Sequence, residues 1–148
     1  MIQSLSVIIP AYNEADRIVT TLRDVLHHLP TLATTWEIIV VDDGSTDATV
    51  HVIETALPEE VNKGIVRVKS ISHAGKGGAG RIGIFLAKQE WVLFMDADNA
   101  TSISELLHLV PYTNEYPIII GSRALLELGI ERQEFWVRKV IGTCFNWL

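Results

Sequence analysis

The stretch Trp91-Val92-Leu93-Phe94-Met95-Asp96-Ala97-Asp98 decides the fold class of this chain. Its first five residues are apolar and predict a buried strand over 91–95. Two carboxylates follow, one residue apart, and alternation along a strand would point Asp96 and Asp98 to the same side, where they repel each other. A divalent cation, Mg²⁺ or Mn²⁺, would relieve that repulsion, because both ions prefer hard oxygen ligands. The pattern therefore predicts a metal site at the carboxyl end of a strand, where ligands bind in open α/β sheets.

A purely structural role is the alternative for this acidic pair. Asp98 could simply cap the helix that follows, with Asn99, Thr101 and Ser102 as rival caps.

The rest of the chain repeats the same alternation of strand and helix. Short apolar, β-branched runs predict strands over 5–10, 36–41, 65–71, 91–95 and 117–121. Helical spacing and capping residues predict helices from Asn13 or Glu14 to Leu29, from Ser45 or Thr46 to Leu57, over 77–88 and over 104–109. Pro30 and Pro58 are expected to end the first two helices. This order predicts an α/β fold with a mostly parallel sheet and helices on both faces.

Composition bounds the function. The chain has 148 residues, 48% of them hydrophobic, which suits one domain with a substantial core. Its net charge of -6 argues against a nucleic-acid-binding surface. The single Cys144 excludes an internal disulfide and gives no support for a zinc cluster. We expect no cleavable leader and no membrane-spanning segment, because the sequence has no basic region before an apolar one and no long apolar stretch.

The loops after the first two predicted strands carry polar side chains. Tyr12 and Glu14 follow Pro10 at the end of the first strand, although this motif by itself favours a strand end, a surface tyrosine and a helix cap. Asp42 and Asp43 follow the second strand, and an acidic residue at this position can accept hydrogen bonds from ribose hydroxyls or a base edge. Two adjacent buried aspartates are difficult to explain structurally, so we expect Asp43 to be functional.

The loop after the third predicted strand is rich in glycine. In Gly75-Lys76-Gly77-Gly78-Ala79, glycines let backbone N–H groups approach phosphate oxygens, and Lys76 could supply charge. The run is not a Walker P-loop, because no Ser or Thr follows the lysine. Tight packing of a glycine-faced helix on the sheet is the structural alternative. His73 fits a solvent-facing loop residue as well as it fits a ligand.

Together these motifs resemble the family 2 inverting glycosyltransferases of the GT-A fold, in the group that includes dolichyl-phosphate sugar synthases. The resemblance rests on 6–14, 41–47, 75–79, 95–98 and Gly121-Ser122-Arg123. The glycine run, and Ala100-Thr101 after Asp98, are most similar to dolichyl-phosphate glucosyltransferases, with the mannosyl enzymes as near neighbours. Two departures are Gly80, where relatives often carry a β-branched residue, and Asn99, where they often carry Gly.

The resemblance assigns roles to individual residues. It implies a nucleoside pocket lined by Pro10, Tyr12, Glu14 and Asp43, and a diphosphate held near Lys76, Ala97 and the metal ligands Asp96 and Asp98. Arg123 would contact the diphosphate or the acceptor phosphate. Arg138 would be a second phosphate-binding arginine, or else lie on a solvated helix face. Asp98, Arg123 and Arg138 are the expected catalytic residues.

The resemblance also implies an activity. We expect a hexosyltransferase that moves glucose from UDP-glucose, or mannose from GDP-mannose, to a polyprenyl (dolichyl) phosphate with Mg²⁺ or Mn²⁺. An acceptor phosphate is already anionic and needs no general base. The expected location is peripheral, at the cytoplasmic face of a membrane. A non-catalytic nucleotide-sugar-binding or assembly module is the rival hypothesis, and a transferase for a saccharide acceptor is the third.

The chain is expected to divide into a nucleotide-sugar-binding domain over 1–124 and a second segment over 125–148. The apolar residues of 134–148 predict a helix that lies on a membrane interface, pairs with a second subunit in a homodimer, or completes the core. Truncation of a longer protein is a further possibility, because family members usually continue well past this point.

Overall fold

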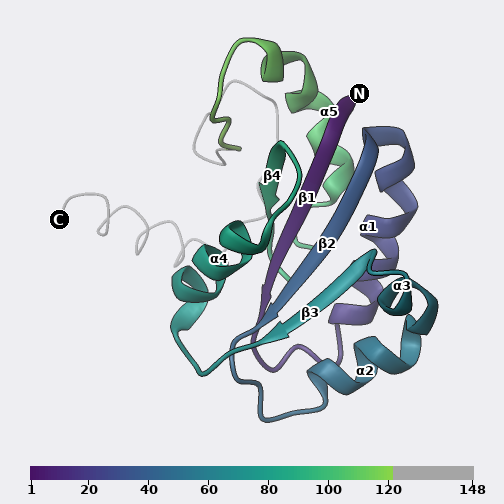
Figure 1. Ribbon diagram of the computed structural model, residues 1–148, viewed down its shortest axis with the longest axis vertical. Coiled ribbons are helices and arrows are strands. Elements are labelled where there is room, and N and C mark those ends of the chain that lie inside the picture. The colour runs from purple at the N-terminus through teal and green to yellow at the C-terminus, as the bar shows by residue number, and fades with distance from the viewer. Residues whose placement is uncertain (122–148) are drawn as a thin grey trace, which may run out of the picture. The chain divides into compact units, whose positions relative to one another are not determined.

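The computed structural model describes residues 1–121. Residues 1–117 form one compact α/β unit (Figure 1). Its strands are β1 (Ile2–Ala11), β2 (Ala33–Asp42), β3 (Val66–Ser70) and β4 (Trp91–Phe94). Its α-helices are α1 (Ile18–Leu32), α2 (Thr49–Ala56), α3 (Pro58–Asn62), α4 (Gly75–Leu86) and α5 (Leu106–Leu109), and two 3₁₀ helices are η1 (Ile103–Glu105) and η2 (Val110–Asn114).

The sheet of the described residues has the strand order β3-β2-β1-β4, and every neighbouring pair is parallel. The chain first adds β2 and β3 on one side of β1, and then crosses back to place β4 on the other side. Strand order therefore reverses beside β1. In open parallel sheets such a reversal opens a crevice at the carboxyl ends of the strands, where ligands bind.

Both faces of the sheet are buried, as the apolar strands predicted. On one face Val7, Ile9 and Val40 pack against the apolar side of α1. On the other face the interleaved residues Ile8 and Val41 pack against α4. Figure 1 shows α4 on one side of the sheet and α1, α2 and α3 on the other. The predicted mostly parallel sheet with helices on both faces is confirmed.

Helix α4 approaches the sheet closely because of its glycines. A Cβ atom on Gly83 would collide with the side chain of Ile8 and lie 3.3 Å from Cγ2 of Val41. A Cβ atom on Gly80 would lie 2.6 Å from Cε2 of Phe94. The structural explanation considered for these glycines therefore holds, and it accounts for glycine at position 80.

The first helix differs from its predicted bounds at both ends. It begins at Ile18, because Asn13 has a left-handed φ of 55° and the amides of Arg17 and Ile18 both donate to the Glu14 carbonyl in a turn. It continues past Pro30 to Leu32. Pro30 has no N–H to donate to a preceding carbonyl, but the Ala33 amide donates to the Leu29 carbonyl at the helix end, and the extension fully buries Leu32.

The observed bounds of the other helices also differ from the predicted ones. Helix α2 begins at Thr49 rather than at Ser45 or Thr46, and Pro58 is the first residue of α3, a favourable position because its missing N–H is not needed there. Helix α4 begins at Gly75 and ends at Leu86. The predicted strand over 117–121 is wrong. These residues form no strand, and the side chains of Ile118 and Ile120 are exposed.

A buried carboxylate joins three strands and the α4–β4 turn. Glu37 on β2 accepts hydrogen bonds from the Ser6 hydroxyl at 2.8 Å, from Arg67 at 2.7 Å and from the Lys88 amide at 2.7 Å. Burial acts to raise the pKa of Glu37, but these hydrogen bonds and the Arg67 charge hold its pKa below the ordinary value of 4.5. The same Ser6 hydroxyl accepts from the Gln89 amide, so this network fixes the turn that leads into β4.

Candidate functional site

A cleft of about 330 Å³ lies at the carboxyl ends of the strands, where strand order reverses. Its lining comes from the end of β1, from the loops after the four strands and from the first turn of α4: Pro10, Ala11, Tyr12, Glu14, Asp43, His73, Lys76, Asp96, Ala97 and Asp98. Every site residue predicted within 1–121 is therefore part of one cleft. Arg123 and Arg138 lie outside the described residues.

Asp43 is held in the cleft wall on both of its oxygens. It is 3% exposed; Oδ1 accepts from the Ala74 amide at 2.7 Å, and Oδ2 lies 2.9 Å from Nδ1 of His73. The neighbouring Asp42 instead accepts from the Ser45 amide and stabilises the turn. The two adjacent aspartates therefore have different surroundings, and only Asp43 lines the cleft.

His73 is the cleft residue that sequence reasoning left open. Its ring lies 4.8 Å from the ring of Tyr12, tilted by 42°, and it contacts Asp43. The one feature of the sequence that indicated a cleft residue was the position of His73 after β3, beside the glycine run. The contacts themselves join loops far apart in the sequence, so they could not be predicted.

The acidic pair lies in a turn and not on the strand. Strand β4 ends at Phe94, so strand alternation is the wrong reason for placing Asp96 and Asp98 together, although both line the cleft. Asp96 is ion-paired with Lys76 at 2.5 Å, and Oδ1 of Asp98 accepts from the Ala100 amide at 3.0 Å. Asp98 does not cap the next helix.

That helix cap is Ser102, one of the rival residues considered, whose hydroxyl accepts from the Ser104 amide. Asn99 has a left-handed φ of 52°. Glycine and asparagine are the residues that tolerate this conformation best, so asparagine suits this position.

The donor set fits a divalent cation that shares its coordination with a ligand. Within residues 1–121 no group of three or more His, Cys, Asp or Glu side chains is arranged to hold a metal ion. Asp96 and Asp98 supply two carboxylates, and Mg²⁺ is commonly bound by one or two carboxylates together with substrate phosphates and water.

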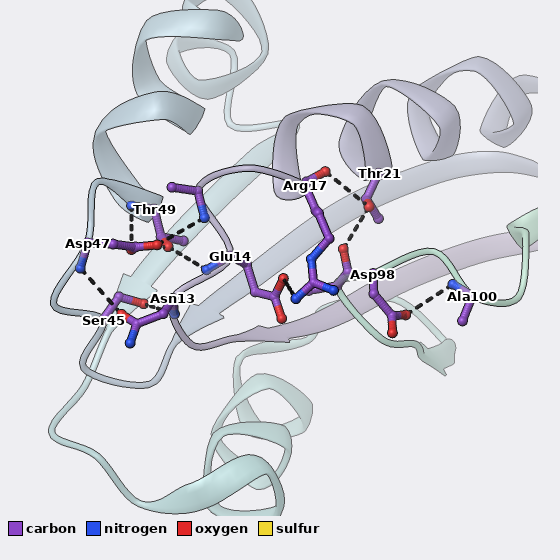
Figure 2. A network of polar contacts seen from close by, with 11 residues as sticks. Asn13, Glu14, Arg17, Thr21, Ser45, Asp47, Thr49, Asp98 and Ala100 are labelled. Atoms are coloured by element: carbon purple, nitrogen blue, oxygen red, sulfur yellow. Dashed lines mark hydrogen bonds and ion pairs between the residues drawn. The ribbon is translucent and has the colours of Figure 1, made fainter.

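The loops after β1 and β2 are tied together beside the cleft (Figure 2). Oδ1 of Asn13 accepts from the Thr46 amide at 2.8 Å, and the Asn13 amide donates to the Ser45 hydroxyl at 2.9 Å. Asp47 accepts from the Ala15 amide at 3.1 Å and from the amide and hydroxyl of Thr49. The Thr49 hydrogen bonds are the main reason that the pKa of Asp47 lies below its ordinary value.

Glu14 is held by Thr49 and by Arg17. Its amide donates to the Thr49 hydroxyl at 2.9 Å, and Oε2 forms an ion pair with Arg17 at 2.7 Å. Oε2 is shielded from solvent and its contact with Arg17 lacks hydrogen-bond geometry, so a cleft ligand with a donor group would satisfy it.

The parallel sheet that reverses beside β1, with a cleft at its carboxyl edge, defines an open α/β domain of the class that binds ligands at this edge. The sequence model of glycosyl transferase family 2 matches residues 6–132, so the chain belongs to that family. It is 34% identical over 158 residues to the dolichyl-phosphate beta-glucosyltransferase of Homo sapiens, covering 99% of this chain and 49% of that protein. The chain spans about half the length of the curated relatives it matches.

Solved structures agree on the fold. S. aureus TarS in complex with UDP-GlcNAc is similar with a TM-score of 0.60 and 28% identity, over 76% of this chain and 32% of that one. The mannosyltransferase PcManGT from Pyrobaculum calidifontis, in complex with GDP-Man and Mn²⁺, gives a TM-score of 0.61 and 25% identity over the same shares. The predicted GT-A fold is confirmed. In the described part of the chain, no helix is long and apolar enough to cross a bilayer.

Proposed function

We propose that this chain is the donor-binding part of an enzyme that transfers glucose from a nucleoside-diphosphate sugar to dolichyl phosphate. The observation that carries the proposal is the meeting of Tyr12, Asp43, Lys76, Asp96 and Asp98 around one cleft. The name of the human relative supports the choice of glucose and of dolichyl phosphate.

Two groups of contacting residues line the cleft, Tyr12 with His73 and Asp43, and Lys76 with Asp96, and they suit the two parts of such a donor. Tyr12 offers an aromatic face to a base, and buried Asp43 offers an acceptor for its edge or for ribose hydroxyls. Asp96 and Asp98 would hold Mg²⁺ or Mn²⁺ against the diphosphate, beside Lys76. When bound, the cation would neutralise charge that develops on the leaving diphosphate.

The acceptor side of the reaction is proposed on chemistry alone. A polyprenyl phosphate brings its own anionic nucleophile, so transfer with inversion requires alignment opposite the leaving group rather than a general base. Arg123 and Arg138 are proposed to contact phosphate oxygens. An acceptor of this kind is embedded in a membrane, so we propose that the enzyme acts at a membrane surface, on the cytoplasmic face. Residues 125–148 are proposed to contact that membrane or, alternatively, to form a homodimer.

Calorimetric titration of the 148-residue chain with UDP-glucose and with GDP-mannose, each with Mn²⁺ or with EDTA, tests the donor assignment. We expect one donor to bind more tightly with Mn²⁺. Asp98→Asn should remove that increment, because it deletes the charge but keeps an oxygen for the Ala100 amide. Glu54→Gln, at an exposed position of α2, is the matched control. Equal donor affinity in Asp98→Asn and wild type would disprove the metal assignment.

A donor-binding module without transferase activity is the second candidate, because the chain spans only about half of its relatives. Transfer of labelled glucose to dolichyl phosphate by this chain would reject the module. Donor binding without any transfer would support it.

A further inference from the structure

Helix α1 holds the acidic loop at two points that flank Asp98. The Thr21 hydroxyl donates to the Ala97 carbonyl at 2.7 Å, and both residues are buried. Three residues further along the helix, Oδ2 of Asp24 accepts from the side-chain amide of Asn99 at 3.0 Å. Residues three apart lie on the same side of a helix, so Thr21 and Asp24 present both tethers to one loop.

The Thr21 hydroxyl bonds the acidic loop in preference to its own helix. The Thr21 hydroxyl also lies 3.4 Å from the Arg17 carbonyl of its own helix, but a hydroxyl has one proton and the contact with Ala97 is far shorter. Figure 2 shows Thr21 on α1 joined to the loop that carries Asp98. The Ala97 carbonyl is buried beside this hydroxyl and would lose its hydrogen bond without it.

The second tether fixes an unusual backbone. Asn99 has φ 52°, and its side chain is fastened to Asp24. The Ser102 hydroxyl reaches the same Asp24 oxygen at 3.4 Å. Asp24 also lies 3.4 Å from Nδ1 of His28, within α1. The tether therefore joins the loop, the cap of η1 and the helix.

Asp98 depends on these neighbours for its position. It is exposed, and in the described part of the chain its carboxylate makes one hydrogen bond, to the Ala100 amide two residues away. That bond is local and does not fix the loop against the sheet. The tethers at Ala97 and Asn99 supply that constraint on either side.

We infer that Thr21 and Asp24 are positioning residues that hold the Asp98 carboxylate where the cleft binds a divalent cation with a nucleotide diphosphate. The inference rests on the proposed function and adds two residues of α1 to it. Groups that orient metal ligands without touching the metal affect metal affinity strongly.

The test measures Mn²⁺ affinity from the paramagnetic resonance signal of free Mn²⁺, with saturating UDP or GDP, whichever the wild-type chain binds. Thr21→Val keeps the side-chain shape and removes the hydroxyl. We expect Mn²⁺ affinity to fall about tenfold or more, and nucleotide affinity in EDTA to stay unchanged. Thr21→Ser should restore the wild-type Mn²⁺ affinity because it keeps the donor.

The matched control is Thr31→Val on the same helix, where the hydroxyl donates to the His28 carbonyl of its own helix instead of to the acidic loop. It should bind Mn²⁺ as wild type does. Asp24→Ala is the second variant: its side chain is 29% exposed, so it should fold even if Thr21→Val does not, and it should weaken Mn²⁺ binding in the same way. Denaturant unfolding of each variant checks that the fold is intact.

Wild-type Mn²⁺ affinity in folded Thr21→Val and Asp24→Ala would overturn the inference and leave the proposed function standing. An equal loss of nucleotide affinity in EDTA would also overturn it, because the damage would then be general. Absence of metal-dependent nucleotide binding in the wild-type chain would reject the proposed function and the inference together.

Discussion

Nδ1 of His73 lies 2.9 Å from Oδ2 of Asp43, so the loop after β3 orients the buried carboxylate at the end of β2. The same imidazole nitrogen lies 3.1 Å from the Asp43 carbonyl, and the ring contacts Tyr12. His73 therefore links the aromatic and the acidic parts of the proposed nucleoside pocket.

His73→Ala should weaken nucleotide binding in EDTA about fivefold to tenfold, the equivalent of one hydrogen bond. Stability should change little, because the His73 side chain is 62% exposed. Calorimetry with UDP and GDP gives the affinity, and His51→Ala, at an exposed position of α2, is the control. Undiminished affinity for the preferred nucleotide would remove His73 from the pocket.

Gly83→Ala should destabilise the fold by about 1–3 kcal/mol, because the new methyl group collides with buried Ile8. Gly77→Ala on the same helix is the matched control, since nothing lies within 4 Å of its new Cβ. Better helix propensity should make that control more stable by up to about 1 kcal/mol. Urea unfolding measures both, and similar effects at the two positions would contradict the packing argument.

Asn13→Gly should cost about 1–2 kcal/mol by removing the side-chain hydrogen bonds to the Thr46 and Asp47 amides. Asn13→Ala should cost about 1 kcal/mol more, because alanine is strained at φ 55°. Thermal unfolding of the two variants separates the lost bonds from the strain. If alanine proved as stable as glycine, the left-handed backbone would not be required here.

Glu37 should make stability fall in acid. Its folded pKa lies below the ordinary 4.5, so its contribution is complete above pH 4.5 and is lost as the pH falls through the folded value. Glu37→Gln should therefore flatten the dependence of the unfolding free energy on pH below 4.5. Glu54→Gln should retain the wild-type slope. Urea unfolding between neutral and acidic pH gives these slopes.

Sequence patterns located the site because its residues follow strands. Carboxyl ends of parallel strands meet at one edge, which is why Asp43, Lys76 and Asp96, each following a strand, line one cleft. Patterns were weaker at element ends. Pro30 was expected to stop α1, yet burial of Leu32 extends the helix, and the predicted strand over 117–121 did not form.

The sequence by itself therefore determined the α/β class, the layers and the loops that carry the chemistry, because these follow from local periodicity and from the geometry of parallel strands. Only the tertiary structure decided which polar groups pair. Thr21 meets Ala97 across 76 residues and Asn13 meets Thr46 across 33. The packing of helices and loops on the sheet determines which polar groups come within hydrogen-bond distance. Because the chain contains many polar residues of the same types, the sequence alone does not identify the partners.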